Sequence, residues 1–429
     1  MSTIDDWAAT TPLKGRQPVP LIALKDWFSA EGRRNPYPFY AKLHELGHAA
    51  SLDRKVDRYS AVVYSYEAIE RVMRDPVFRM LDDAYLDFLD GGDKPLWRRR
   101  ESLRTLQRTV FFLNPPDHTR LRRIFAGAFT PRRVAKLEPA VANLIDRRLD
   151  RIEELGAGGQ VVDFMAEFAY PLPSDVIGEL VGVPEEDRAW FPPRSEPFSL
   201  VLEPGPHNWR YLRDGDKAAA ELWAYYTDLI ATKRALPGDD LISALLQQQA
   251  ENADFTDDEL VANLIGLYNA GFLTSVHSIG SGLVLLLERP THADDLREHP
   301  EKGAAFCEEI LRYKTPVQFG VRWASEDADV MGVPVPKGTE VLILHGAANW
   351  DPKRFPQPEV FDPDRPDNHP MSFSIGPHYC LGAALSRLEI QLTMPMVLRR
   401  FPKIRMAGPL RTLDLLTFHG YKEIPITIS

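Results

Sequence analysis

The sequence predicts a mainly α-helical protein with small β-sheets, and three observations favour this fold class. Apolar residues recur at helical spacing through most of the chain before Pro316. The longest of these patterns runs from Thr256 to Pro290, and the strand-like patterns are short and mostly follow Pro316. Because no internal repeat or linker marks a boundary, we expect a loose N-terminal tail over residues 1–20 and a single domain over residues 21–429.

The composition excludes several classes of protein. The 429 residues are 44% hydrophobic and carry a net charge of −10, which argues against nucleic-acid binding by the chain as a whole. The two cysteines, Cys307 and Cys380, are too few for a disulfide framework and favour a reducing compartment. Residues 1–20 lack a signal-peptide pattern, and no uninterrupted apolar run reaches about 18 residues. We therefore expect a cytoplasmic protein without a membrane span.

The first elements follow from helix capping and periodicity. Asn35-Pro36-Tyr37-Pro38 opens an amphipathic helix that continues through Leu46. Two short apolar runs, 48–52 and 58–64, predict a small hairpin. Ser65 then caps a helix. The apolar side of that helix contains Ala68, Ile69, Val72 and Met73.

Residues 75–115 show little periodicity and contain a basic run. Arg98-Arg99-Arg100 is followed by Arg104 and Arg108. A segment of this kind is either a lid or binding segment or a solvated charged helix, and the sequence leaves both interpretations open. Further helices are expected from Asn114 to Phe129 and from about Pro139 to Gly156, and more follow to about Ala250.

The longest predicted helix contains several glycines. Thr256-Asp257-Asp258-Glu259 is a capping box and Pro290 ends the run, which gives a helix of ~50 Å at 1.5 Å per residue. Gly271, Gly280 and Gly282 lie inside it, although each interior glycine costs about 1 kcal/mol relative to alanine. Either the close approach of a flat ligand or tight helix packing accounts for them.

The last third of the chain mixes short strands with loops. A helix over 306–313 precedes strand-like patterns over 317–324 and 330–344. A Pro/Asp-rich segment over 351–370 leads to a loop that contains Cys380, and a long helix follows that loop.

Cys380 lies where this loop turns into a helix. The positive end of the helix dipole favours the thiolate, which is the form that binds metals. A single thiolate without a second cysteine nearby is a poor zinc or iron–sulfur site, because both need about four ligands. It suits a metal whose other ligands come from elsewhere, such as haem iron held by a single axial thiolate. The alternative is a buried structural cysteine before a helix.

Phe373-x-x-Gly376-x-His378-x-Cys380-x-Gly382 resembles the haem-binding loop of the cytochrome P450 family. The resemblance extends over nearly the whole chain from Asn35-Pro36-Tyr37 onward. It implies the cytochrome P450 fold, with a long central helix over the haem, and haem b (iron protoporphyrin IX) as cofactor. It also implies that Cys380 is the iron ligand and that Gly382 belongs to the cofactor-binding loop.

Within the long helix, residues 269–275 resemble the oxygen-binding kink of the family, which reads Ala-Gly-x-acid-Thr. The resemblance gives Ala270, Gly271 and Thr274 catalytic positions, with the Thr274 hydroxyl bonding the bound oxygen and helping to deliver protons. Leu273 departs from the pattern, because the family has Asp or Glu there. Proton delivery then remains open between Thr274 with water, Ser275, His277 or a hydroxyl of the substrate, or the chemistry needs no ordinary oxygen cleavage.

The family pattern also implies two sets of charged residues. Glu309-x-x-Arg312 together with Arg365 resembles the structural triad that fixes the thiolate-bearing chain. Haem carries two propionates that need cationic partners when they are partly buried. The positions that match those partners are His118, Arg122, Arg322 and His378.

The leading functional hypothesis is an enzyme, a haem-thiolate monooxygenase that hydroxylates or otherwise oxidises a mid-sized organic substrate of secondary metabolism. The alternative, suggested by Leu273, is an atypical oxidation such as oxidative coupling, dehydrogenation or rearrangement. A third hypothesis is a non-catalytic haem-binding recruitment module, against which Thr274 and the intact cysteine loop argue.

The resemblance is to the soluble bacterial type, which implies a separate ferredoxin and ferredoxin reductase as partners. We expect a basic patch on the cysteine face to steer the ferredoxin. The patch contains Arg120, Arg123, Arg132 and Arg133. The scattered arginines are also compatible with an anionic substrate, or with a substrate that is tethered to a carrier protein.

Overall fold

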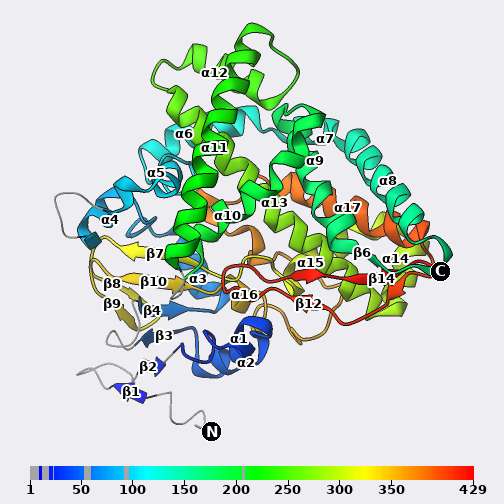
Figure 1. The fold of residues 1–429 in the computed structure, drawn as a ribbon. Helices are drawn as coiled ribbons and strands as arrows, with labels where there is room; N and C mark the ends of the chain where they lie inside the picture. Colours follow the sequence, from blue (N-terminus) through cyan, green and yellow to red (C-terminus); the bar gives the residue numbers. More distant parts are fainter. Residues whose placement is uncertain (1–8, 12–18, 23, 53–58, 91–95, 205–207) are drawn as a thin grey trace. The chain divides into compact units, whose positions relative to one another are not determined.

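A computed structural model describes residues 9–11, 19–22, 24–52, 59–90, 96–204 and 208–429. The chain forms two compact units (Figure 1). The first, the sheet unit, comprises residues 1–81, 308–380 and 412–419, and the second, the helical unit, comprises residues 82–307, 381–411 and 420–429. Helices dominate and the sheets are small, so the predicted fold class is confirmed.

The sheet unit is built on a seven-stranded sheet with the order β1-β2-β3-β4-β10-β7-β5. The strands are β1 (Ala9–Thr11), β2 (Val19–Ile22), β3 (Ala49–Leu52), β4 (Tyr59–Val63), β5 (Phe78–Arg79), β7 (Gly320–Ala324) and β10 (Glu340–Ile343). β3 and β4 pair in antiparallel fashion, which confirms the predicted hairpin. β1 and β2 also pair, so these two parts of the expected tail are strands, whereas the rest of that tail lies outside the described residues.

Two hydrophobic clusters cover the two faces of this sheet because side chains alternate along a strand. On β4, Val62 belongs to one cluster, with Trp27 and Tyr40, whereas Ala61 and Val63 belong to the other. The helices of this unit are α1 (Ala30–Arg34), α2 (Tyr37–Leu46), α3 (Tyr66–Arg74) and α16 (His345–Ala348), and a small ribbon joins β8 (Ala328–Val330) to β9 (Val333–Val335). The Ser65 hydroxyl accepts from the Ala68 amide and caps α3 as predicted.

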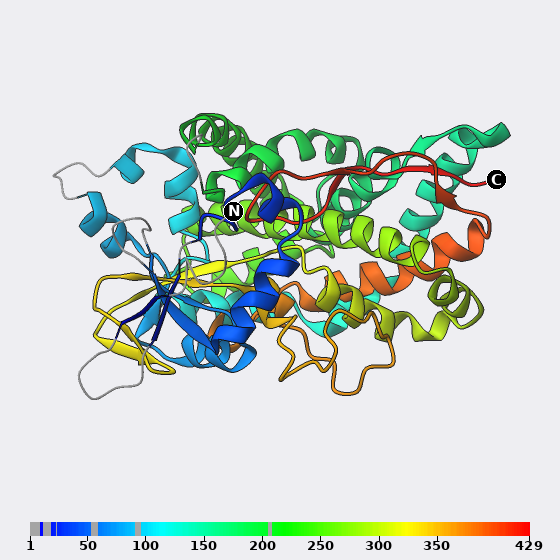
Figure 2. The ribbon, with the colours of Figure 1, turned by 90° about the horizontal axis from the view of Figure 1, so that it is seen from below.

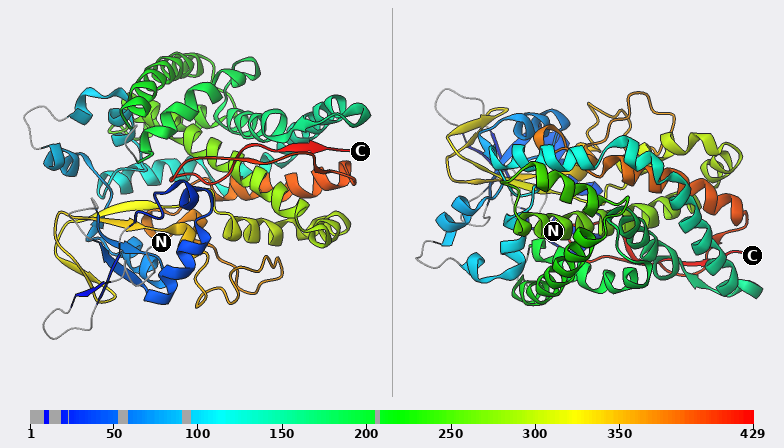
Figure 3. Two further views of the ribbon diagram at one scale, coloured as in Figure 1. Left: turned by 60° about the horizontal axis from the view of Figure 1, so that its bottom comes forward. Right: turned by 90° about the horizontal axis from the view of Figure 1, so that it is seen from above.

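The central helix of the helical unit is α13 (Asp257–Leu287). It packs against α9, α10, α11 and α17 (Figures 2 and 3). The predicted capping box is present at Thr256 and Glu259. By length and hydropathy α13 could cross a membrane, but 78% of its most apolar window is buried inside the protein. The other helices are α4 (Asp83–Asp90), α5 (Glu101–Gln107), α6 (Asp117–Ala128), α7 (Pro131–Lys136), α8 (Glu138–Leu155), α9 (Pro171–Val181), α10 (Pro192–Ser199), α11 (Asn208–Ala235), α12 (Leu241–Glu251), α14 (Pro290–Glu298) and α17 (Ala383–Arg400).

A small sheet of this unit has the order β11-β14-β6 and is made of β6 (Val162–Asp163), β11 (Arg405–Met406) and β14 (Pro425–Thr427), and a further short strand is β13 (Tyr421–Glu423). α15 (Gly303–Tyr313) carries the chain from the helical unit into the sheet unit. The segment without clear periodicity contains α4 and α5. Four of its arginines form ion pairs, namely Arg98 with Asp87, Arg100 with Asp216, Arg104 with Glu101 and Arg108 with Asp258. In the described residues this segment therefore contains charged helices held by ion pairs.

Candidate functional site: the cysteine loop and the exposed face of the long helix

The predicted site residues divide between the two units. Cys380, His378, Arg322 and the triad belong to the sheet unit, and the remaining site residues belong to the helical unit. Those of the helical unit are His118, Arg122, Ala270, Gly271, Thr274 and Gly382.

The cysteine loop is a tight structure that rests on α3. The amide of Cys380 donates to the carbonyl of Phe373 over 2.9 Å, which closes the loop around the residues between them. Gly376 has a φ of 77°, and a Cβ there would lie 2.7 Å from the backbone oxygen of Met73. Only glycine suits this position, because a side chain would be strained and would collide with backbone.

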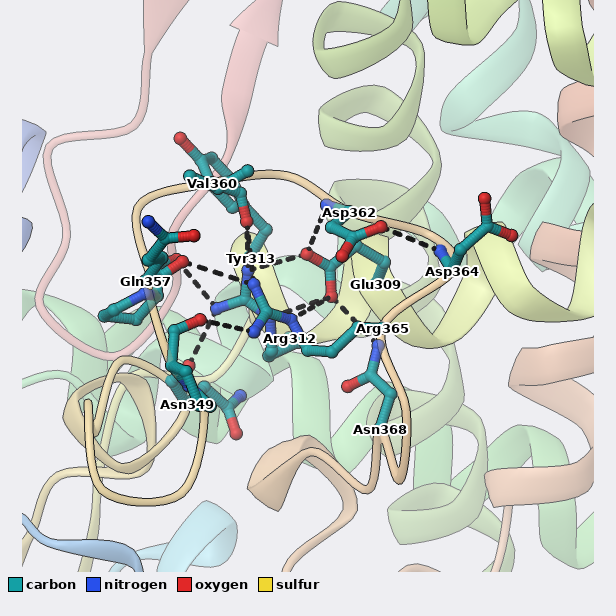
Figure 4. Close-up of polar contacts among 12 residues, drawn as sticks. Glu309, Arg312, Tyr313, Asn349, Gln357, Val360, Asp362, Asp364, Arg365 and Asn368 are labelled. Carbon is teal, nitrogen blue, oxygen red and sulfur yellow. Dashed lines mark hydrogen bonds and ion pairs between the residues drawn. The ribbon is translucent and has the colours of Figure 1, made fainter.

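Glu309, Arg312 and Arg365 meet beside this loop (Figure 4). Arg312 donates to both carboxylate oxygens of Glu309, over 2.8 and 2.7 Å, and both side chains are fully buried. Arg365 places its Nε 3.7 Å from Glu309 Oε2 and donates to the carbonyls of Pro356, Gln357 and Val360. A buried ion pair is tolerated only when its remaining donors and acceptors are also satisfied.

The remaining donors of Arg312 are satisfied by backbone carbonyls. They belong to Asn349, Pro358 and Val360, at 2.9–3.0 Å. Glu309 in turn accepts from the amide of Asp362 over 2.8 Å and from the side chain of Asn368 over 2.9 Å. The ion pair therefore helps to fix the chain from 349 to 368.

Three further hydrogen bonds connect this fixed segment to the start of the cysteine loop. Asn349 Oδ1 accepts from the amide of Met371 over 2.6 Å, and Asn349 Nδ2 donates to Ser372 Oγ over 2.8 Å. Ser372 Oγ donates to the carbonyl of Leu311 over 2.7 Å. The charged cluster and the loop are therefore one continuous network within the sheet unit.

Arg322 on β7 is a buried cation without an acidic partner among the described residues. It is 7% exposed, and its guanidinium donates only to the carbonyl of Val321, over 2.9 Å. Burial lowers its pKa to about 10. An unpaired buried charge is costly, so the site fits an anionic group such as a haem propionate.

In the helical unit, His118 and Arg122 lie one turn apart on α6. His118 is 3% exposed and Arg122 is partly exposed. Gly382 directly precedes α17, and a Cβ there would meet no described atom within 4 Å.

One face of α13 is open although most of the helix is buried. Ala270 is exposed, and Gly271 and Thr274 are partly exposed. α13 remains helical through this stretch, and Thr274 Oγ1 donates to the carbonyl of Ala270 over 2.7 Å. Such a bond to the preceding turn tends to bend a helix.

The interior glycines have packing partners. A Cβ at Gly271 would lie 2.4 Å from Cδ1 of Ile177, and one at Gly280 would lie 2.6 Å from the sulfur of Met165. Helix packing therefore contributes to the use of glycine at both positions, although the atoms in the way are the flexible ends of side chains.

The candidates for proton delivery around Leu273 differ in their surroundings. Leu273 is 2% exposed, so an apolar side chain fills the position of the usual acid. The ring of His277 packs against that of Tyr170, and a Cβ at Gly420 would lie 2.7 Å from it. Ser275 is also buried, and its side chain lowers the pKa of Glu389 on α17.

Glu389 is a residue that the sequence interpretation missed. It is 2% exposed, its Oε2 has no hydrogen-bond partner in the described part of the chain, and burial raises its pKa to about 8. The sequence feature that could have identified Glu389 is the presence of an acidic residue within the apolar run of Leu385, Leu388 and Ile390. A carboxyl on the buried side of a helix is neutral unless it is paired.

The predicted basic patch is weaker than its four arginines suggested. Arg120 pairs with Glu259 and lies within 3.7 Å of Asp117 and 3.6 Å of Asp254, so nearby carboxylates offset its charge. Its guanidinium pKa is raised chiefly by the hydrogen bond to Glu259. Arg123, Arg132 and Arg133 form no ion pair with the described residues.

Comparison with known proteins identifies the family. Residues 208–301 and 304–406 match the cytochrome P450 family model. The chain is 32% identical over 405 residues to the biotin biosynthesis cytochrome P450 of Bacillus subtilis strain 168, covering 94% of this chain and 98% of that protein. It is 38% identical over 320 residues to 6-deoxyerythronolide B hydroxylase of Saccharopolyspora erythraea, covering 74% of this chain and 77% of that protein.

A solved structure agrees with these relatives. The crystal structure of P450BioI in complex with an acyl carrier protein ligated to hexadec-9Z-enoic acid matches with a TM-score of 0.84 and 31% identity, covering 93% of this chain and 99% of that one. The resemblance found in the sequence, and the haem cofactor that it implied, are therefore confirmed. The chain belongs to the cytochrome P450 family, and it is a haem-thiolate monooxygenase.

Proposed function

We propose that this monooxygenase oxidises a mid-sized natural-product intermediate, with Cys380 as the iron ligand. The observation that carries the proposal is the network from Glu309 and Arg312 through Asn349 to the cysteine loop. It holds the thiolate-bearing chain rigid, which a metal ligand requires. When bound, haem supplies the oxidising power that inserts oxygen into C–H bonds, and the protein supplies positioning and control of water.

The site residues have distinct roles in this proposal. In the sheet unit Arg322 and His378 would hold haem propionates, and in the helical unit the positions that would do so are His118 and Arg122. Ala270, Gly271 and Thr274 form the open face of α13, where the haem would be held, and Thr274 Oγ1 would accept a hydrogen bond from a water molecule that supplies protons. Because this hydroxyl already donates to the Ala270 carbonyl, it is held in place and can accept from a water molecule.

The substrate class draws support from two relatives. One relative is named for hydroxylating 6-deoxyerythronolide B, and the other is solved with an acyl chain on a carrier protein. We therefore include a substrate tethered to a carrier protein in the proposal. Electrons come from a separate ferredoxin and its reductase, and the setting is the cytoplasm.

A second function, an atypical oxidation such as coupling, dehydrogenation or rearrangement, is favoured by Leu273. An apolar, 2% exposed side chain there cannot carry a proton. The second function differs from hydroxylation in its product, because no oxygen atom from O2 remains in the substrate.

The testing experiment combines spectroscopy with isotope labelling. The reduced protein with carbon monoxide should show the red-shifted Soret band of a thiolate ligand, and Cys380→Ala should abolish it. Cys307→Ala is the matched control, because Cys307 is the other cysteine and lies buried in the helical unit. A normal band in Cys380→Ala would refute the assignment of the ligand. With a substrate found by spectral screening of metabolite pools, label from ¹⁸O2 in the product separates the two functions.

A further inference from the structure

His345 lies beside Arg322 in the sheet unit and has no assigned role. β7 and β10 pair in antiparallel fashion, with Gly320 opposite Ile343 and Arg322 opposite Val341. His345 follows two residues after Ile343 and begins α16. Side chains two residues apart on a strand share a face, so Gly320 and Arg322 face the same side of the sheet.

Gly320 makes room for the imidazole. A Cβ at Gly320 would lie 3.1 Å from Nε2 and 3.8 Å from Cδ2 of His345. The backbone after His345 is also fixed, since the amide of Gly346 donates to the carbonyl of Gln318 over 3.1 Å. The ring is therefore held against bare backbone on the face that carries Arg322.

Both side chains lack the partners that their burial requires. Within the described ranges, the Arg322 guanidinium donates only to the carbonyl of Val321. Nδ1 of His345 is buried and has no hydrogen-bond partner among the described residues. Burial and the positive charge of Arg322 lower the pKa of His345 to about 4, so the ring is neutral at neutral pH and carries one N–H.

We propose that His345 and Arg322 together bind one carboxylate group, to which Arg322 supplies the charge and His345 Nδ1 supplies a second hydrogen bond. A buried cation with spare donors, next to an imidazole whose Nδ1 is unpartnered among the described residues, matches a carboxylate better than any neutral group. The inference rests on the proposed function, in which this carboxylate is a haem propionate. A carboxylate of the substrate has the same chemistry and is the other source to be tested.

The experiment compares holoenzymes of wild type, His345→Phe and His345→Gln. Phenylalanine fills the space without a donor, whereas glutamine keeps one. We expect His345→Phe to accelerate haem transfer to excess apomyoglobin about tenfold, the factor for one hydrogen bond to a charged group, and His345→Gln to stay within about threefold of wild type. The matched control is His44→Gln, because His44 is likewise partly exposed, has a pKa lowered by burial, and bonds the carbonyl of Ala347 instead.

Reconstitution with iron protoporphyrin IX dimethyl ester identifies the source of the carboxylate. If His345 binds a propionate, the tenfold difference between wild type and His345→Phe disappears with the ester. If it binds the substrate, haem transfer is unchanged, and His345→Phe weakens binding of hexadecanoate but not of its methyl ester.

The inference is overturned if His345→Phe changes neither the rate of haem transfer nor the binding of hexadecanoate relative to its methyl ester. It is also overturned if His345→Gln loses haem as fast as His345→Phe. The proposed function fails separately, by the absence of the thiolate Soret band in wild type.

Discussion

Glu309 and Arg312 lie one turn apart on α15 and are joined by two hydrogen bonds, of 2.7 and 2.8 Å, with neither side chain exposed. The contribution of such a buried pair to the free energy of unfolding depends on whether both charged partners are present. Removing one partner leaves the other as an uncompensated buried charge, which costs about 3–5 kcal/mol.

Glu309→Gln should therefore destabilise the protein by about 3–5 kcal/mol and reduce haem content, because Arg312 and Arg365 lose their shared carboxylate. Thermal unfolding and the ratio of Soret to protein absorbance measure the two effects. The control is Glu301→Gln, since Glu301 is exposed and, among the residues that the structure describes, forms an ion pair only with His299. The free energy of unfolding of Glu301→Gln should stay within about 0.5 kcal/mol of the wild-type value. Equal stability of the two variants would contradict the structural role of the triad.

Leu273→Glu tests the missing acid on α13. At a position that is 2% exposed, burial would keep the new carboxyl protonated and able to donate. We expect more product per electron pair than in wild type, together with a loss of stability. Leu273→Gln has nearly the same size without the acid and should give no such gain. If wild type already couples electrons to product tightly and Leu273→Glu adds nothing, the leucine is not a defect in proton delivery.

Glu389 makes stability depend on pH. Burial raises its folded-state pKa to about 8, above the ordinary value of 4.5, so the folded state holds this proton more tightly than the unfolded state. Its contribution to stability is therefore undiminished below pH 4.5 and falls as pH rises through the window from 4.5 to about 8. The upper limit of this loss is on the order of 5 kcal/mol at 1.36 kcal/mol per pKa unit.

Glu389→Gln should remove that part of the pH dependence. The melting temperature of the variant relative to wild type should rise between pH 5.5 and 8.5, because glutamine never has to ionise. Glu251→Gln, an exposed change on α12, should follow wild type across the same range. A constant difference between Glu389→Gln and wild type would mean that Glu389 is already ionised in the folded protein.

The basic patch predicts salt-dependent reduction by an acidic ferredoxin. Arg123, Arg132 and Arg133 have no ion pair in the described part of the chain, so added salt should slow the second-order reduction rate measured by stopped flow. Arg123→Gln with Arg132→Gln should lower that rate at low salt and flatten its salt dependence. Arg411→Gln, at an exposed arginine paired with Glu423, controls for a change in net charge. Salt-independent rates would argue against electrostatic steering.

The sequence by itself determined the features that depend on neighbours in the chain. The capping box at Thr256, the serine cap of α3 and the hairpin of β3 and β4 were predictable because their signals lie within a few residues. The cysteine loop was recognisable for the same reason, because its closing hydrogen bond joins the Cys380 amide to the Phe373 carbonyl only seven positions earlier. The spacing of Glu309 and Arg312 likewise places both on one face of a helix.

Only the tertiary structure decided which of these groups are paired, buried or exposed. Arg120 was counted as a free cation, but α13 and the loop before it bring Glu259 and Asp254 to it. Gly271 packs against Ile177, and Glu389 meets Ser275, over separations of many residues that no local pattern encodes. The charge of a side chain is written in the sequence, but its pKa and its partners depend on burial, and burial is a property of the packed chain.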